Sequence, residues 1–395
     1  MCRRGGVLGD TKMKFLSKIT ILFFMITMAF AVVSCTQSSG SSSSKKTEES
    51  EKIEETPLTL KFITDGEITI KFPWSTLKYS KNGGALTAVE ATGNPLTASI
   101  SVKKDDRVSF YAVASENPPD TGNPRSDNMN IACSSDCYIY GNIMSLVTLE
   151  ADSDNWDPSA KTLTTERCFM VLFYNNSHIK NHSEKSLLLP ATTLSDECYF
   201  YMLANCTSLT SAPELPATTL TRYCYGDLFA GCTNLKAAPE LPATVLANGC
   251  YENLFSECIS ITSAPALPVT KLEGWCYSGM FYGCTSITTA PELPATTLVY
   301  HCYNWMFSGC TGLTSAPDLP AETLEDGCYN RMFKDCSNLK YIKCLATDIS
   351  GVDSTTLWVE GIPTSGTFVK AAGADWSGKT GNDGIPSGWT VEDAE

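Results

Sequence analysis

The chain has 395 residues, and its 43 acidic and 29 basic residues give a net charge of −14 at pH 7. Residues 1–34 are basic overall, so the acidic excess lies in the rest of the chain. No basic patch stands out, which argues against a nucleic acid as partner. The length allows two or three domains.

The N-terminal pattern predicts export. Lys14 and Lys18 precede an uncharged apolar run, which extends from Ile19 to Val33. This run suits a signal peptide and is shorter than the ~20 residues of a membrane span. Its end, Val32-Val33-Ser34-Cys35, resembles the lipobox of bacterial lipoproteins. The resemblance implies removal of residues 1–34 and lipidation of Cys35, with an ordinary secretory signal or a signal anchor as alternatives.

Residues 35–57 are rich in serine and then in charged residues. Such a segment cannot bury a core, so we expect a flexible tether. The resemblance implies that this tether holds the folded part away from a membrane. We therefore expect a lipid-anchored protein of the outer membrane or cell surface.

Residues 58–147 are expected to form a small, sandwich-like β domain. Apolar and polar residues alternate from Leu58 to Phe62 and from Ile68 to Phe72, as in strands with one buried face. Asn82-Gly83 is a hairpin signal. Cys133 and Cys137 flank Ser-Ser-Asp, where we expect a local disulfide that closes a turn.

A repeat of 26 residues dominates the following part of the chain, residues 148–345. Six copies run from Leu189 to Cys344. Two cysteines recur in register: Cys198, Cys224, Cys250, Cys276, Cys302 and Cys328, then Cys206, Cys232, Cys258, Cys284, Cys310 and Cys336. A degenerate copy precedes them, with Asn176 in place of its second cysteine. A fixed period of this length indicates stacked units, none of which can bury its apolar face alone.

Each repeat is predicted to contain one helix and one short strand. Leu220, Cys224, Leu228 and Cys232 are spaced by four residues, which indicates the apolar stripe of a helix. Gly231 fits the left-handed residue at its end. Leu209 to Pro216 is expected to be extended, with Leu209, Ala212 and Leu215 pointing inward.

The units "LPATTL…CY…MF…GCTSLT" resemble the BspA-type leucine-rich repeats of bacterial surface proteins. This repeat is longer than the commoner unit of that family. The expected fold class is therefore an α/β solenoid of leucine-rich repeats, preceded by the β domain. Residues 346–395 abandon the period, and short strands at Gly366 to Lys370 and Gly388 to Val391 predict a C-terminal β cap.

The repeat cysteines favour buried free thiols in two ladders. The two cysteines of one unit would lie ~12 Å apart along a helix, too far for a disulfide. Disulfides between neighbouring units remain an alternative. Zinc is disfavoured because no C-x-x-C spacing occurs.

Nothing in the sequence indicates catalysis. The three histidines, His178, His182 and His301, do not form a zinc-protease motif, and no nucleophile elbow or phosphate-binding loop is present. We expect surface positions for these histidines. We also expect no catalytic residue, no metal and no cofactor.

Aromatic residues gather just before and after the first repeat cysteine. Tyr201, Tyr223, Trp275, Tyr300 and Trp305 are the candidate ligand-binding residues, because stacked rings can bind a protein or a sugar. The alternative is that these positions are unconstrained and partly cover the neighbouring repeat. A second row, Glu214, Glu240, Glu292 and Asp318, is expected to be a solvated acidic edge.

Two functions remain open. The first is a non-catalytic interaction or adhesion module whose ligand is a host matrix protein or a bacterial surface protein. The resemblance to BspA-type proteins implies this function. The second is a glycan-binding lipoprotein of a nutrient-uptake system. One localised aromatic site would favour the second function, and a scattered row the first.

Overall fold

The computed structural model describes residues 55–71, 77–112, 128–147 and 156–395. All of the described residues belong to one compact unit, Glu51–Glu395. The expected signal peptide, Cys35 and nearly all of the tether lie outside the described residues. Within the described part, no helix is long and apolar enough to cross a membrane.

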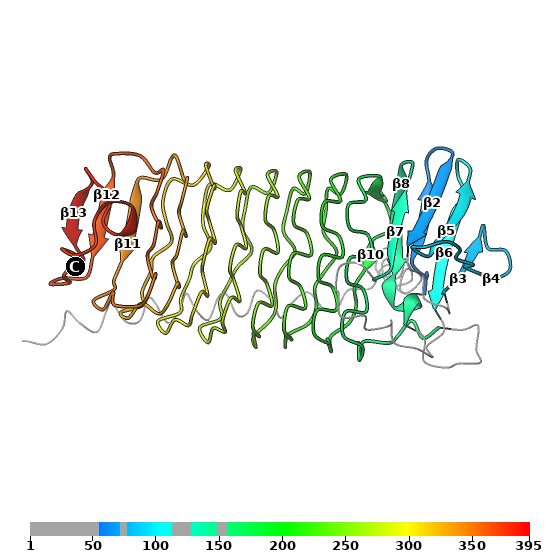
Figure 1. Cartoon of the computed structure of the whole chain (residues 1–395), viewed down its shortest axis with the longest axis horizontal. Helices are drawn as coiled ribbons and strands as arrows, with labels where there is room; N and C mark the ends of the chain where they lie inside the picture. The colour runs from blue at the N-terminus through cyan, green and yellow to red at the C-terminus, as the bar shows by residue number, and fades with distance from the viewer. Residues whose placement is uncertain (1–54, 72–76, 113–127, 148–155) are drawn as a thin grey trace, which may run out of the picture. The chain divides into compact units, whose positions relative to one another are not determined.

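The strands before the repeats form two sheets (Figure 1). The larger sheet contains β1 (Thr59–Phe62), β3 (Leu77–Lys81), β4 (Thr87–Ala88), β6 (Arg107–Ala112) and β8 (Cys137–Asn142). The smaller sheet has the order β5-β2-β7, with β2 at Gly66–Lys71, β5 at Thr97–Val102 and β7 at Asn130–Cys133. All pairs among these eight strands are antiparallel.

The core of this part is formed by every second side chain along the strands. Leu60 and Phe62 of β1, Ile68 and Ile70 of β2, and Phe110 of β6 are almost completely buried. Their neighbours along the strands are more exposed, because successive side chains point to opposite faces. Burial of these faces stabilises the fold by roughly 1.5–3 kcal/mol for each large side chain.

The two sheets continue directly into the repeats. After the 3-10 turn η1 (Ile143–Leu146), β9 (Ile179–Asn181) and β10 (Leu187–Leu188) both pair with β8 in parallel. The N–H of Ile131 in β7 also donates to the carbonyl of Leu172 in the degenerate repeat. The first repeat therefore stacks on the strands through main-chain hydrogen bonds.

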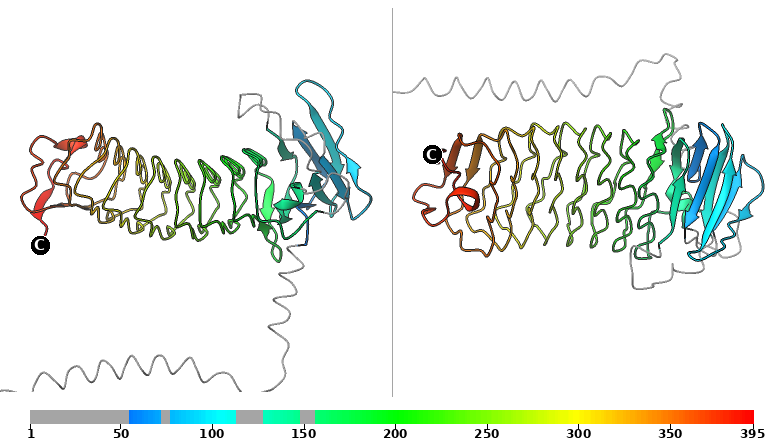
Figure 2. Two further views of the ribbon diagram at one scale, coloured as in Figure 1. Left: turned by 90° about the horizontal axis from the view of Figure 1, so that it is seen from below. Right: turned by 45° about the horizontal axis from the view of Figure 1, so that its top comes forward.

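The predicted α/β solenoid is wrong, because the described residues contain no α-helix and their strands form separate sheets. Each 26-residue unit, here called a coil, is instead a chain of turns joined to an extended segment. No strand lies between Leu188 and Tyr341, so the expected short strand is absent from the first five full repeats. The last full repeat has it, as β11 (Tyr341–Cys344). Figure 2 shows the coils following one another in chain order.

Backbone hydrogen bonds in the turn segment alternate between two partners. The N–H groups of Tyr225, Asp227 and Phe229 donate to carbonyls of the next coil, those of Cys250, Glu252 and Leu254. The N–H groups between them donate to the third residue back, as from Gly226 to Tyr223. Every fourth residue has a positive φ, for example Tyr223 (50°), Asp227 (51°) and Gly231 (70°). An α-helix has neither feature.

The helix prediction failed because the apolar spacing is four residues and not 3.6. A strict spacing of four drifts about 40° at each step around a helix, whereas it repeats without drift in a chain of four-residue turns. Leu220, Cys224, Leu228 and Cys232 do face inward and are all buried. The prediction that these four side chains are buried is therefore confirmed, but a chain of turns and not a helix buries them.

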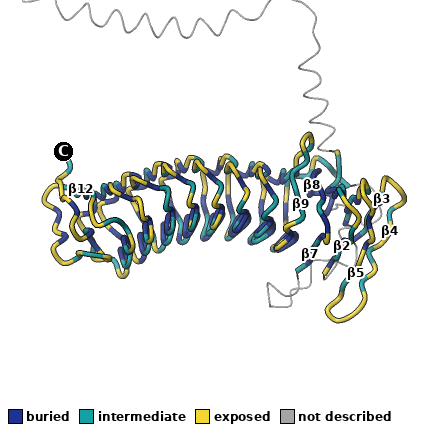
Figure 3. The backbone as a smooth tube through the Cα atoms, turned by 90° about the horizontal axis from the view of Figure 1, so that it is seen from above, coloured by how far each residue is buried: buried dark blue, intermediate teal, exposed yellow. Residues whose placement is uncertain are grey.

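Aromatic ladders fill the inside of the coils. Tyr199, Tyr225, Tyr251, Tyr277, Tyr303 and Tyr329 stack on one another with ring centroids 5.7–6.1 Å apart. Phe229, Phe255, Phe281, Phe307 and Phe333 form a second stack at 5.7–5.9 Å. Figure 3 shows buried residues recurring at the same place in successive coils.

The C-terminal part covers the last coil. Strands β11 (Tyr341–Cys344), β12 (Thr367–Lys370) and β13 (Thr390–Asp393) form a parallel sheet, and η2 is a short 3-10 turn at Gly381–Asp383. The ring of Trp358 stacks on Tyr329, and Trp376 stacks on Trp358. These rings continue the tyrosine ladder and end it.

The expectation of free repeat cysteines is confirmed, since all twelve are free and buried. The thiols of the second ladder donate to carbonyls about one coil back, as from Cys284 to Phe255 at 3.0 Å. In the degenerate repeat, Asn176 Nδ2 donates to the carbonyl of Ile131. Asparagine and cysteine therefore satisfy main-chain acceptors at equivalent positions.

The expected disulfide between Cys133 and Cys137 is wrong. Their Sγ atoms lie 3.6 Å apart, and the Cys137 thiol donates to Cys133. A disulfide requires about 2.05 Å. The two residues end β7 and begin β8, which belong to different sheets. The hydrogen bond from Cys137 lowers the pKa of Cys133 and raises that of Cys137.

Candidate binding surface

The five candidate aromatic residues all lie in the turn segments of the coils. Tyr300 is 48% exposed, whereas Tyr201, Tyr223, Trp275 and Trp305 are half-buried. These four also have φ between 50° and 59°, a left-handed conformation that bulky residues rarely adopt. The same conformation recurs at every fourth residue of each coil, so it belongs to the fold and is not by itself a sign of function.

The first group of rings surrounds Tyr201 and Tyr223. The Phe200 ring lies edge-on to both, with centroids 4.5 Å and 5.9 Å away. The guanidinium of Arg222 lies 5.6 Å from the Tyr223 centroid, which is cation–π geometry. Arg222 also pairs with the buried carboxylate of Glu197 at 3.0 Å. This side of the surface is thus held in place by charge pairs.

The second group contains the other three candidates. Trp275 stacks on His301 with centroids 4.1 Å apart, and Tyr300 lies edge-on to His301 at 6.3 Å. Trp305 contacts Tyr282 edge-on at 5.7 Å, and the guanidinium of Arg331 lies 5.0 Å from its centroid. Three successive coils therefore contribute to this group.

Glycines make room for the rings. A Cβ at Gly249 would lie 2.1 Å from the Tyr223 ring, and one at Gly274 would lie 2.2 Å from the Tyr300 ring. A Cβ at Gly327 would likewise lie 2.2 Å from His301. Each ring therefore rests on the bare backbone of an adjacent coil. The pairing of an aromatic residue with glycine one repeat away was the sequence signal for this packing.

Two acidic groups, Asp227 and Glu252, lie near Tyr223 of the first ring group. Burial raises the pKa of Glu252 to about 7, and the neighbouring carboxylate of Asp227 adds to this effect. Burial, followed by the charge of Glu252, also raises the pKa of Tyr223. Glu252 forms no ion pair with any other residue in the described ranges.

Sequence reasoning missed two residues of this surface, Tyr282 and Arg331, and it did not count His301 among the candidate ligand-binding residues. His301 was expected to be an ordinary surface residue, but it lies between Trp275 and the backbone of Gly327. The other histidines contact the N-terminal strands: His178 Nδ1 lies 3.0 Å from Asp136 Oδ1, and His182 packs edge-on against Tyr138 and Tyr140.

The acidic row lies elsewhere, in the extended segments. Glu214, Glu240, Glu292 and Asp318 are all exposed. Only the last of them has an ion-pair partner among the described residues, since Asp318 Oδ2 lies 2.6 Å from Lys343 Nζ. Within the described ranges, no group of three or more His, Cys, Asp or Glu residues is arranged to hold a metal ion.

None of the five candidate residues lines either of two hollows in the described part of the chain. The smaller hollow is about 50 Å³, room for roughly one water molecule, and lies beside His182 and Lys185. The larger hollow lies between the extended segments of two coils. The aromatic residues therefore form a surface and are not part of these cavities.

Comparison with known proteins adds no relative: no protein-family model, no curated protein and no solved structure matches this chain. Functional interpretation thus rests on the residues themselves.

Proposed function

We propose that this protein is a non-catalytic interaction module that binds a protein partner through its aromatic surface, defined here as Tyr201, Tyr223, Trp275, Tyr282, Tyr300, His301, Trp305 and Arg331. The observation that supports the proposal is the contact group around Trp275, Tyr300 and Trp305. Tryptophan, tyrosine and arginine are the residues most enriched at the energetic centres of protein interfaces.

The packing of the rings supports a protein ligand over a sugar. Each ring is partly fixed before binding, by a glycine, a neighbouring ring or a guanidinium, so little conformational entropy is lost on association. The rings spread over several coils and none lines the two hollows, which suits a broad contact. The resemblance of the repeats to BspA-type surface proteins favours an adhesion role, with a host matrix or bacterial surface protein as partner.

A lipid anchor at Cys35 completes the proposal and places the module at the outer membrane or cell surface. The lipobox-like residues before Cys35 support it. Several acyl chains on one residue give stable anchoring. A Cys35→Ser variant should move from the membrane fraction to the soluble fraction and lose incorporation of labelled palmitate. Retention of the label in this variant would exclude the anchor.

The test of the interaction is an array of host matrix proteins and an array of glycans, probed with the full chain. The variant Tyr223→Ala/Trp275→Ala/Tyr300→Ala removes three rings of the aromatic surface. The matched control Val245→Ala/Ile259→Ala/Val391→Ala removes three exposed apolar side chains elsewhere. Melting temperatures of both variants establish that they fold, and Tyr300→Ala alone tests the most exposed ring.

We expect a protein signal that the control retains and the ring variant loses by about 30-fold or more, the loss of one interface hot spot. Equal binding by the folded ring variant would reject the aromatic surface. Glycan binding without protein binding would replace this proposal with the nutrient-uptake alternative.

A further inference from the structure

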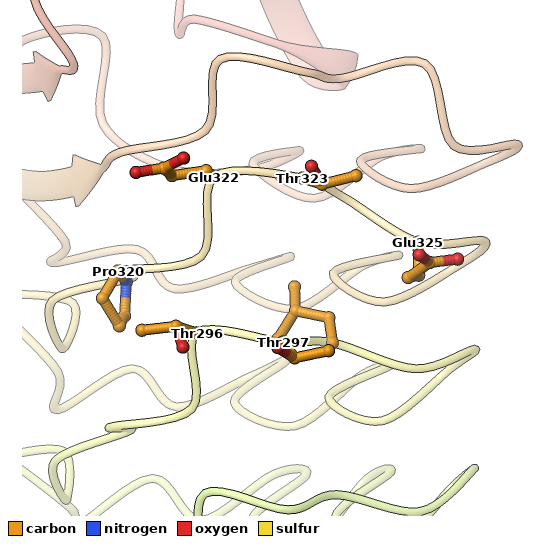
Figure 4. A pocket seen from close by; sticks show the side chains of 7 residues that line it. Thr296, Thr297, Pro320, Glu322, Thr323 and Glu325 are labelled. Atoms are coloured by element: carbon orange, nitrogen blue, oxygen red, sulfur yellow. The ribbon is translucent and has the colours of Figure 1, made fainter.

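The larger hollow lies between the extended segments of two successive coils, whose turn segments carry Tyr300, His301, Trp305 and Arg331 of the aromatic surface. It measures about 610 Å³ and is lined by Thr296, Thr297, Leu298, Pro320, Glu322, Thr323 and Glu325. Figure 4 shows Thr296 and Thr297 on one segment and Pro320, Glu322, Thr323 and Glu325 on the next. This volume is within the range of ligand-binding pockets, roughly 300–1,000 Å³.

Main-chain groups on both sides of this groove lack partners in the described structure. In the coil pair that contains Thr218 and Thr244, the N–H groups of Thr244 and Val245 donate to the carbonyl of Thr218, and the N–H of Leu220 donates to Val245. The equivalent bonds between Thr296, Leu298, Glu322 and Thr323 are absent. The N–H groups of Leu298, Glu322 and Thr323 are thus free, whereas the carbonyl of Glu322 accepts from Thr347 and Asp348 of the following coil. Free main-chain donors beside such a groove suit the backbone of an extended peptide.

Two carboxylates distinguish this groove from the gaps between other coils. The position of Glu322 is threonine in the five preceding full repeats, namely Thr192, Thr218, Thr244, Thr270 and Thr296. Neither Glu322 nor Glu325 forms an ion pair with another residue that the structure describes. Unpaired carboxylates beside main-chain donors and acceptors favour a ligand that combines a cation with a peptide backbone.

We propose that this groove binds an extended peptide segment of a partner protein, with an arginine or lysine side chain of that segment between Glu322 and Glu325. The main chain of the peptide pairs with the N–H groups of Leu298, Glu322 and Thr323 and with the carbonyl of Thr296. The cationic side chain provides the selectivity, because carboxylates bind a guanidinium through two parallel hydrogen bonds. The groove is lined by other residues than those of the aromatic surface, and the inference does not depend on the function proposed for that surface.

The test is selection of short randomised peptides from a displayed library on the full chain, with counter-selection on the Glu322→Gln/Glu325→Gln variant. Both residues are exposed, so the variant should fold. The matched control, Glu214→Gln/Glu240→Gln, removes the same charge from exposed positions in other coils. Selected peptides are then synthesised with citrulline, the uncharged analogue, in place of arginine.

We expect the selected peptides to share an arginine or lysine. Their affinity should fall by about tenfold or more in the groove variant and with citrulline, as for the loss of one charge-assisted hydrogen bond, and stay unchanged in the control variant. Equal weakening in both variants would show a general charge effect and overturn the proposal. Failure to recover any peptide that distinguishes the wild type from the groove variant would overturn it as well.

Discussion

The hydroxyl of Tyr300 is hydrogen-bonded to Asn248 Nδ2 at 2.7 Å, although 52 residues separate the two along the chain. The bond connects two coils that are not adjacent, and it places the Tyr300 ring across the intervening Gly274. Gly274 therefore supports the aromatic surface, because its lack of a side chain leaves room for the Tyr300 ring.

Gly274→Ala should displace the Tyr300 ring, because the new Cβ would lie 2.2 Å from its Cζ. We expect a loss of about 1 kcal/mol in the free energy of unfolding, together with weaker partner binding. Urea unfolding and the array described above measure these effects. Gly378→Ala is the control, since no atom lies within 4 Å of its Cβ position. Equal stability of the two variants would contradict the packing described for Tyr300.

Phe281→Ala should be strongly destabilising. The ring is fully buried and stacks on Phe255 and Phe307 at 5.9 Å and 5.7 Å, so its removal leaves a cavity inside the coils. We expect a loss of about 3–5 kcal/mol in the free energy of unfolding. Tyr282→Ala, which truncates the exposed neighbouring ring, should cost less than about 1 kcal/mol. Similar losses for both would show that the phenylalanine ladder does not form the core.

The buried thiols should make the protein sensitive to alkali. Burial raises the pKa of Cys232 and Cys284 to about 12, whereas the ordinary value is 9.0. Above pH 9 the unfolded chain loses thiol protons that the folded chain keeps, so stability decreases between pH 9 and 12. Each such thiol should contribute a slope of ~1.4 kcal/mol per pH unit in this range.

Urea unfolding at pH 8, 9 and 10 measures this slope. The variant Cys232→Ala/Cys284→Ala should show a smaller decrease above pH 9 than the wild type. A thiol reagent should also label the folded protein slowly at pH 8 and label all cysteines in denaturant. Rapid labelling of the folded chain would contradict the burial of the cysteine ladders.

Glu252 should produce a separate pH effect under acidic and neutral conditions. Its pKa is raised from 4.5 to about 7, so the unfolded chain ionises first as the pH rises. Stability should therefore decrease between about pH 4.5 and 7, and Glu252→Gln should remove this decrease. At pH 8 the variant should be more stable by on the order of 1 kcal/mol, after allowance for solvent screening.

Glu257→Gln provides the control for this prediction. It removes the same charge from an exposed residue of the same coil. Chemical denaturation at pH 5 and pH 8 compares the three proteins. A stability gain in the Glu257 variant as large as that in the Glu252 variant would attribute the effect to net charge and not to burial of Glu252.

Much of the organisation followed from the sequence alone. The 26-residue period located the coils, and the inward positions of Leu220, Cys224, Leu228 and Cys232 were correct because a repeated apolar position must be buried wherever units stack. Free repeat cysteines also followed, since asparagine could replace one of them in the degenerate repeat.

Only the tertiary structure decided the backbone. A spacing of four residues fits both the apolar stripe of a helix and a row of turns. Which of the two forms depends on whether the backbone N–H groups donate only within their own coil or also to carbonyls of the next coil. The bond between Asn248 and Tyr300 depends on the stacking of coils and has no counterpart in local sequence. The same is true of the groove beside Glu322, where Thr296 and Leu298 form no main-chain hydrogen bonds with the next extended segment.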